Sequence, residues 1–137
     1  MIKESSSIHI ELPISEEYAH LLRLMVSGIA SHVDFSIDEV DDLKIAAEEA
    51  YLMAINCCFN DSQKIDFDIS DNGLTIIFRD LILPRNGLDD NQRKELDYSV
   101  FIIKAVVDEI EAESAEKMSD LVLLKRLKAV EKNSSPV

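Results

Sequence analysis

The stretch SIDEVDDLKIAAEEAYLMAINCCF, which runs from residue 36 to residue 59, decides how the rest of the chain is interpreted. Ser36 and Glu39 form the S-x-x-E pattern of a capping box, in which each side chain accepts a hydrogen bond from the other residue's backbone N–H. Apolar residues then recur at helical spacing. We therefore predict one long helix over this stretch. It should be buried, yet it carries two adjacent acids, Glu48 and Glu49.

The length and hydrophobicity of the chain favour a single domain. A chain of 137 residues, of which 47% are hydrophobic, can bury one core but is too short for two ordinary domains. We expect this domain to cover residues 1–129 and a frayed tail to cover 130–137. The chain has no run of about 18 apolar residues and no apolar block near its start, so we expect a cytoplasmic protein.

The charge of the chain limits its partners. There are 27 acidic and 14 basic side chains, which give a formal net charge of -13. This balance would repel nucleic-acid phosphates and anionic membrane surfaces, whereas it suits a basic protein partner. We therefore expect a protein partner and no direct binding to nucleic acid or membrane.

The residues that could hold a metal or form a disulfide are poorly arranged for either task. Cys57 and Cys58 are neighbours inside the predicted helix, so they provide neither a disulfide framework nor spaced zinc ligands. The three histidines do not match a metal motif. We predict no metal site and expect both cysteines to pack in the core.

The remaining elements follow from periodicity and from turn residues on either side of the long helix. Strands are grouped apart from helices, which is typical of an α+β two-layer sandwich with helices on one face of a mainly antiparallel sheet. The expected order is a strand at 8–12, a helix at 15–33, the long helix and a hairpin at 65–80 around the turn Asp71 to Gly73. A surface loop at 80–96, in which a short helix is an open alternative, a helix at 98–110 and a second hairpin at 109–128 follow.

The stretch LRLMVSGIASHVDFSIDEVDDLKIAAEEA, residues 22–50, resembles the first half of the serine-kinase anti-sigma factors of bacterial partner-switching modules. These proteins are GHKL, or Bergerat-fold, ATPases. The resemblance covers residues 8–127 in element order and is close across the first two helices. It implies a histidine-kinase-like ATPase fold.

The resemblance assigns catalytic positions on the long helix. It places the family's glutamate general base at Glu49 and the magnesium-binding asparagine position at Met53. A thioether is a poor substitute for an oxygen ligand of a hard cation. Asn56 lies about one helical turn further on and could serve only if the nucleotide shifted. Purely structural explanations are also available. Glu48 could form an ion pair with Lys44, and Met53 could be a core residue that fills the space where the family binds its nucleotide.

The other nucleotide-contacting segments also depart from the family. Asp80 stands where an acid should contact adenine, but residues 81–83 replace the glycines that follow it. We also consider Asp80 as a strand-end residue that accepts backbone hydrogen bonds. Asp97 and Ser99 stand roughly where a glycine-rich turn at a helix start should bind phosphates. In the last box, Ser119 and Asp120 replace glycine and threonine.

We therefore expect a kept fold with weak or lost ATP binding, and no cofactor. The resemblance then implies a regulatory protein that binds a sigma factor, a STAS-type antagonist or both, and that forms a homodimer. We predict partner contacts at Arg23 on the first helix and at Asp89 and Asp90 in the acidic loop.

Two alternatives stay open. The first is a working serine/threonine protein kinase that binds ATP and Mg²⁺ in a rearranged site, with Glu49 as base and Asn56 or Asp97 at the metal. The second is a structural dimer subunit of a larger signalling complex. The first differs from our main interpretation in chemistry, and the second in stoichiometry.

Overall fold

The structure is a computed structural model that describes residues 6–82, 87–115 and 118–127, so the tail predicted at 130–137 lies outside it. In chain order, the elements are β1 (Ser6–Pro13), the 3-10 turn η1 (Glu16–Tyr18), α1 (Ala19–Ala30), α2 (Ile37–Cys57), β2 (Ser62–Ser70), β3 (Gly73–Ile82), α3 (Asp90–Val106), β4 (Glu109–Ala115) and β5 (Met118–Arg126).

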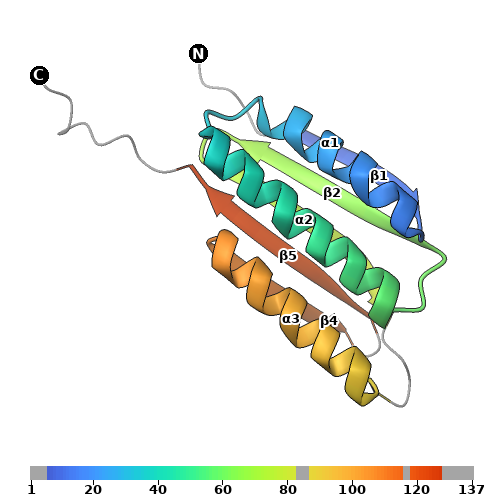
Figure 1. The fold of residues 1–137 in the computed structure, drawn as a ribbon. Coiled ribbons are helices and arrows are strands. Elements are labelled where there is room, and N and C mark those ends of the chain that lie inside the picture. The colour runs from blue at the N-terminus through green and yellow to red at the C-terminus, as the bar shows by residue number, and fades with distance from the viewer. Residues whose placement is uncertain (1–5, 83–86, 116–117, 128–137) are drawn as a thin grey trace, which may run out of the picture.

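The strands form one antiparallel sheet in the order β1-β2-β3-β5-β4. The three helices lie side by side on one face of this sheet, with α2 between α1 and α3 (Figure 1). The predicted α+β two-layer sandwich with helices on one face is thereby confirmed. No helix in the described part of the chain combines the length and apolarity that a membrane crossing requires.

The predicted start of α2 is confirmed by its hydrogen bonds. The Glu39 backbone N–H donates to Ser36 Oγ at 3.1 Å, and the Ser36 backbone N–H donates to Glu39 Oε1 at 2.8 Å. The helix then lies between its two neighbours and buries residues on several sides along its second half, because small alanines let α1 and α3 approach it closely. Its buried residues are Leu43, Ala46, Ala47, Ala50, Tyr51, Met53, Ala54 and Cys57.

The sheet buries the face that the strand alternation predicts. Inward side chains of the five strands meet in rows that cross the sheet, because residues paired across strands point to the same face. One such row contains Ile10, Ile65, Phe78, Leu121 and Ala112, and the next contains Ile8, Phe67, Ile76, Leu123 and Ile110.

Two buried polar side chains join elements in ways that the pattern did not predict. The Tyr51 hydroxyl of α2 donates to the backbone that follows β1, with Ser15 O at 2.9 Å. Lys125 of β5 is 7% exposed and donates to Val106 O at the end of α3, at 2.8 Å. A cation is favourable at a helix C-terminus. Its Nζ also lies 3.4 Å from Asp42 Oδ2 of α2.

The loop predicted over 80–96 is wrong at both ends, because β3 continues to Ile82 and α3 begins at Asp90; residues 83–86 of this prediction lie outside the described residues. The missed sign is a capping box. Asp89 Oδ1 accepts from the Gln92 backbone N–H at 2.8 Å, and Gln92 Oε1 accepts from the Asp89 backbone N–H at 3.1 Å. The first turns of α3 are polar because they are exposed, which made them look like a loop. The helix also ends earlier than predicted, at Val106.

Candidate functional site

Glu49, the predicted general base, points from α2 to α3. Ser99 Oγ of α3 donates a hydrogen bond to Glu49 Oε1 at 3.1 Å. Glu49 is half-buried, and Ser99 is 6% exposed. The carboxylate that would activate a substrate hydroxyl is therefore engaged by a side chain of the neighbouring helix.

The expected phosphate-binding turn is absent from the position predicted for it. We placed Asp97 and Ser99 at a helix start, but both lie well inside α3 (Asp90–Val106). Backbone N–H groups beyond the first turn of a helix are already bonded to carbonyls of the preceding turn, so they cannot bind phosphate oxygens. Asp97 is exposed and carries negative charge.

At the observed start of α3, a backbone N–H group that could bind an anion is already bonded to a capping side chain. The Asp89 carboxylate accepts from the Gln92 backbone N–H, which is one of the donors that an anion would otherwise use. Asp90 adds a second acid in the first turn. Both charges stabilise the helix and oppose the approach of a polyphosphate.

The metal-binding position predicted on α2 is buried and lacks an oxygen ligand. Met53 is 6% exposed. Asn56, the substitute that we considered, is exposed, and its backbone carbonyl accepts from Gln92 Nε2 at 3.2 Å. Among the described residues, no group of three or more His, Cys, Asp or Glu side chains could hold a metal ion.

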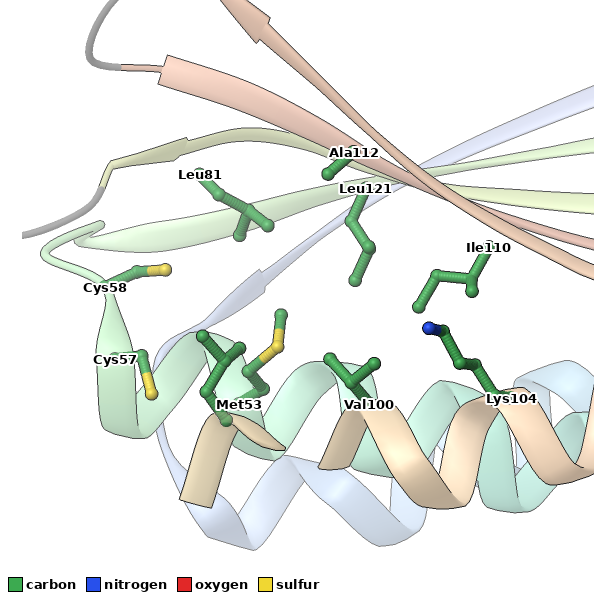
Figure 2. Close-up of a pocket in the computed structure, with 10 residues that line it drawn as sticks. Met53, Cys57, Cys58, Leu81, Val100, Lys104, Ile110, Ala112 and Leu121 are labelled. Carbon is green, nitrogen blue, oxygen red and sulfur yellow. The ribbon is translucent and has the colours of Figure 1, made fainter. Parts of the chain in front are cut away.

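Met53 does not fill the space beside it. A cavity of about 320 Å³ lies between the end of α2, α3 and the sheet. Figure 2 shows Met53 and the cysteines on one side, Val100 and Lys104 rising from α3, and side chains of the sheet on the opposite side. The ten lining residues are Met53, Cys57, Cys58, Leu81, Leu96, Val100, Lys104, Ile110, Ala112 and Leu121.

The two cysteines behave as apolar residues of this cavity, as predicted. Cys57 is 1% exposed and Cys58 9% exposed. Burial raises the pKa of the Cys58 thiol to about 12, with a smaller contribution from Cys57. Burial also raises the pKa of Cys57, and the nearby Glu95 and Asp89 carboxylates add to this effect. Both side chains are therefore neutral thiols at physiological pH.

Asp80, the predicted adenine contact, lies at an irregularity inside β3 rather than at its end. Its φ is +55°, and the register with β5 shifts between Phe78 and Leu81. Asp80 is exposed and is not among the residues that line the cavity. We considered a carboxylate that accepts backbone hydrogen bonds. The bonds at Asp80 instead use its backbone, since its carbonyl accepts from Asn60 Nδ2 at 2.6 Å and its N–H donates to Asp120.

Asp120, from the last family box, points away from the cavity. It belongs to a charged cluster on the face of the sheet that the helices leave open. Arg79 Nε donates to Asp66 at 2.7 Å, and its other arm donates to Asp120 at 2.9 Å. Burial alone would raise the pKa of Asp66, but hydrogen bonds from Arg79 and His9 outweigh burial and lower it. This cluster therefore links four strands, β1, β2, β3 and β5.

The residues predicted to contact a partner are accessible, but their neighbours and their secondary structure differ from those that we predicted. Arg23 of α1 lies 3.7 Å from Glu48 of α2, and both side chains are partly exposed. The predicted ion pair of Glu48 with Lys44 is wrong, because Lys44 lies 3.6 Å from Asp41 instead. Asp89 and Asp90 are exposed at the start of α3 rather than in a loop.

Comparison with known proteins finds similar proteins that are named serine-protein kinase RsbW. No protein-family model matches the chain. A protein of Bacillus velezensis named serine-protein kinase RsbW is 29% identical over 107 residues, and this alignment covers 75% of the chain. The protein of the same name from Oceanobacillus iheyensis is 34% identical, in an alignment that covers 53% of the chain. The one from Bacillus cereus is 23% identical, in an alignment that covers 89% of the chain. The chain is similar to proteins named serine-protein kinase RsbW.

A solved structure agrees with this relationship at the level of the fold. The crystal structure of the RsbU and RsbW domains of Rv1364c from Mycobacterium tuberculosis matches 88% of the chain with a TM-score of 0.63 and 16% identity. The matched region is 32% of that longer chain. The alignments with the first two RsbW relatives span 64% and 49% of their lengths, so shared chemistry has to be judged from the site residues.

The sequence predicted the positions of the candidate residues on α2 but not the shape of the region around them. It placed Glu49 and Met53 correctly on one helix, and it predicted two buried cysteines. It missed the contact of Ser99 with Glu49 and the cavity beside Met53. The sequence feature that could have indicated the cavity is the replacement of expected glycines by larger side chains such as Leu81, which lines it.

Proposed function

We propose that the chain is an anti-sigma-type regulatory protein that binds a sigma factor, a STAS-type antagonist or both, and that it does so without ATP. The RsbW relatives and the resemblance of residues 22–50 to anti-sigma factor kinases support the regulatory role. Under this proposal the protein is cytoplasmic and forms a homodimer, as the resemblance implies.

One observation carries the proposed loss of ATP binding. Ser99, from the middle of α3, donates to Glu49 where the family would need phosphate-binding glycines. Helical backbone at this position offers no free N–H groups, and Met53 offers no oxygen to Mg²⁺. Phosphoryl transfer depends on positioned phosphate and metal contacts, so an isolated glutamate would contribute little. We propose that the protein has no cofactor.

Without a kinase step, partner exchange would rest on competing affinities. A sigma factor and an antagonist would compete for overlapping surfaces, and their relative concentrations would decide which one is bound. The formal net charge of -13 favours a partner with a basic contact surface. Modification of the antagonist by another enzyme would provide a second means of control.

We propose Arg23, Asp89 and Asp90 as partner contacts. Arg23 remains 40% exposed beside Glu48, so its guanidinium can still reach a partner carboxylate. Asp89 and Asp90 are exposed at the start of α3. These residues lie on the two outer helices of the layer, which places the proposed contacts on either side of α2 (Figure 1).

The test is a calorimetric titration of the purified protein with each sigma factor and STAS-domain protein of its own organism, without nucleotide. We expect one partner to bind, and Arg23→Glu to weaken binding at least about tenfold, which corresponds to about 1.4 kcal/mol. Lys64→Glu makes the same charge change at an exposed position on β2 and should leave affinity unchanged.

Two results would contradict this assignment. Equal affinities for the wild type and Arg23→Glu would remove Arg23 from the contact surface. Failure of every sigma factor and antagonist to bind at high micromolar concentration would remove the regulatory role itself. Thermal unfolding of each variant would separate a lost contact from a lost fold.

An active kinase is the second candidate, because the relatives are named serine-protein kinases and Glu49 is retained. In this case ATP and Mg²⁺ would bind a rearranged site, with Glu49 as base and Asn56 or Asp97 at the metal. Incubation with labelled ATP and the candidate antagonists distinguishes the two. Transfer of label that Glu49→Ala abolishes would favour the kinase.

A further inference from the structure

The cavity beside Met53 has the size and lining of a small-ligand site. Its volume of about 320 Å³ lies at the lower end of the range found for ligand pockets. Aliphatic carbon and sulfur atoms line it almost entirely, and the cysteines contribute neutral thiols. The cavity opens to the surface beside Lys104 and Ala112, and its apolar lining offers water few hydrogen-bond partners.

The geometry of α3 explains why the cavity stays open. Leu96, Val100 and Lys104 are spaced four residues apart, so they share one face of the helix and point to the sheet. The side chains opposite include the small Ala112 on β4. In α3 only Ser99 and Ile103 are fully buried, and they lie on the side that packs on α2. The helix is thus anchored to its neighbour rather than to the sheet beneath it.

Lys104 gives this cavity one charge. It is the only charged residue among the described residues that line it. Figure 2 shows its amine extending from α3 along the cavity toward Ile110. Lys104 forms no ion pair with any described side chain, in contrast to Lys44, Arg79, Lys125 and Arg126. Lys104 is exposed overall and lines the cavity, so its ammonium group can bind an anion at the edge of this apolar site.

We propose that this cavity binds a small amphipathic carboxylate, such as a medium-chain fatty acid, with its chain against Met53 and Leu121 and its carboxylate at Lys104. The apolar lining favours the chain, and the single ammonium group favours one negative charge over the several charges of a nucleotide. This ligand is independent of the proposed partner binding, because the site lies between α3 and the sheet.

The test is calorimetric titration of the full chain with decanoate and, separately, with decanol, which has the same chain length without the charge. We expect saturable binding of decanoate at one site. Val100→Phe, which fills the cavity, should weaken decanoate binding at least about tenfold. If that variant does not fold, Ala112→Leu fills the same space from the exposed strand β4.

The charge is tested on its own helix. Lys104→Gln should weaken decanoate binding by roughly threefold to fivefold, as for a partly exposed ion pair, and should leave decanol binding unchanged. Lys94→Gln is the matched control, because Lys94 is exposed on the same helix and does not line the cavity.

Three outcomes would overturn the proposal. The wild type could fail to bind either probe saturably. The cavity-filling variants could bind decanoate as well as the wild type does, which would place the ligand elsewhere. Lys104→Gln could match Lys94→Gln in decanoate affinity, which would remove the carboxylate from the proposal. Unchanged partner titrations with the cavity-filling variants would separate this result from a failure of the regulatory role.

Discussion

At the residue scale, Glu49 is the acid that the resemblance expects as a general base, but its surroundings differ from the expected ones. Its carboxylate still lies on the second helix where the resemblance to anti-sigma kinases places it. Its nearest partner is now the Ser99 hydroxyl, at 3.1 Å. A serine that is 6% exposed must satisfy its hydroxyl, and Glu49 provides the acceptor. The acid therefore has a structural role that accounts for it without catalysis.

The cysteines give a prediction at the same scale. In the native protein, both thiols should react slowly with a disulfide reagent at pH 8, because burial holds them neutral, with a pKa of about 12 for Cys58. The folded state holds the thiol protons more tightly than the unfolded state. The contribution of the thiols to the free energy of unfolding is therefore fully present below the ordinary thiol pKa of 9.0 and is lost as the pH rises toward 12.

The measurement is the rate of thiol release from Ellman's reagent in native and in urea-unfolded protein, together with unfolding midpoints between pH 7 and roughly pH 10. The control variant Cys58→Ala should flatten the loss of stability above the ordinary thiol pKa. Native thiols that react as fast as unfolded ones would show that Cys57 and Cys58 are not buried.

At the element scale, the start of α2 and the buried face of β2 were predicted correctly from the sequence, whereas the polar composition of the first turns of α3 was misleading. The capping box at Ser36 placed the start of α2 correctly, and the alternation in residues 65–69 placed the buried face of β2. The same type of capping box at Asp89 was missed, because the exposed first turns of α3 are polar and resemble a loop. The contacts of Lys125 could not be predicted, since they depend on where α2 and α3 lie over the sheet.

The hairpin of β2 and β3 provides a prediction for one glycine. Gly73 has φ +155°, and a Cβ added there would lie 2.2 Å from the Lys125 carbonyl oxygen of β5. Gly73→Ala should therefore lower the free energy of unfolding by about 2–4 kcal/mol, since β3 and β5 would have to separate. Urea denaturation followed by circular dichroism measures the change.

The matched control is Gly28→Ala in α1. A Cβ at Gly28 meets nothing within 4 Å, and alanine favours helix, so this variant should be neutral or more stable by up to about 1 kcal/mol. If Gly73→Ala were as stable as Gly28→Ala, the close approach of β3 and β5 at the turn would be contradicted.

At the scale of the whole molecule, the fold matches that of an RsbW domain, and we propose that the groups for nucleotide chemistry are replaced. The α+β sandwich and its likeness to an RsbW domain agree with the hydrophobic periodicity of the strands and of the first two helices. The cavity could not be predicted, because it arises where α3 rests on α2 and leaves the sheet beside Ala112 uncovered. Fold and chemistry are encoded by different residues, so one can persist without the other.

The most direct test of this account is calorimetric titration of the purified protein with ATP and Mg²⁺, at protein concentrations that detect millimolar affinity. The account predicts no saturable binding, because residues at the expected phosphate-binding turn lie inside α3 and Met53 stands at the expected metal-ligand position. Saturable binding that Glu49→Ala weakens would contradict it and would favour an active kinase with a rearranged site.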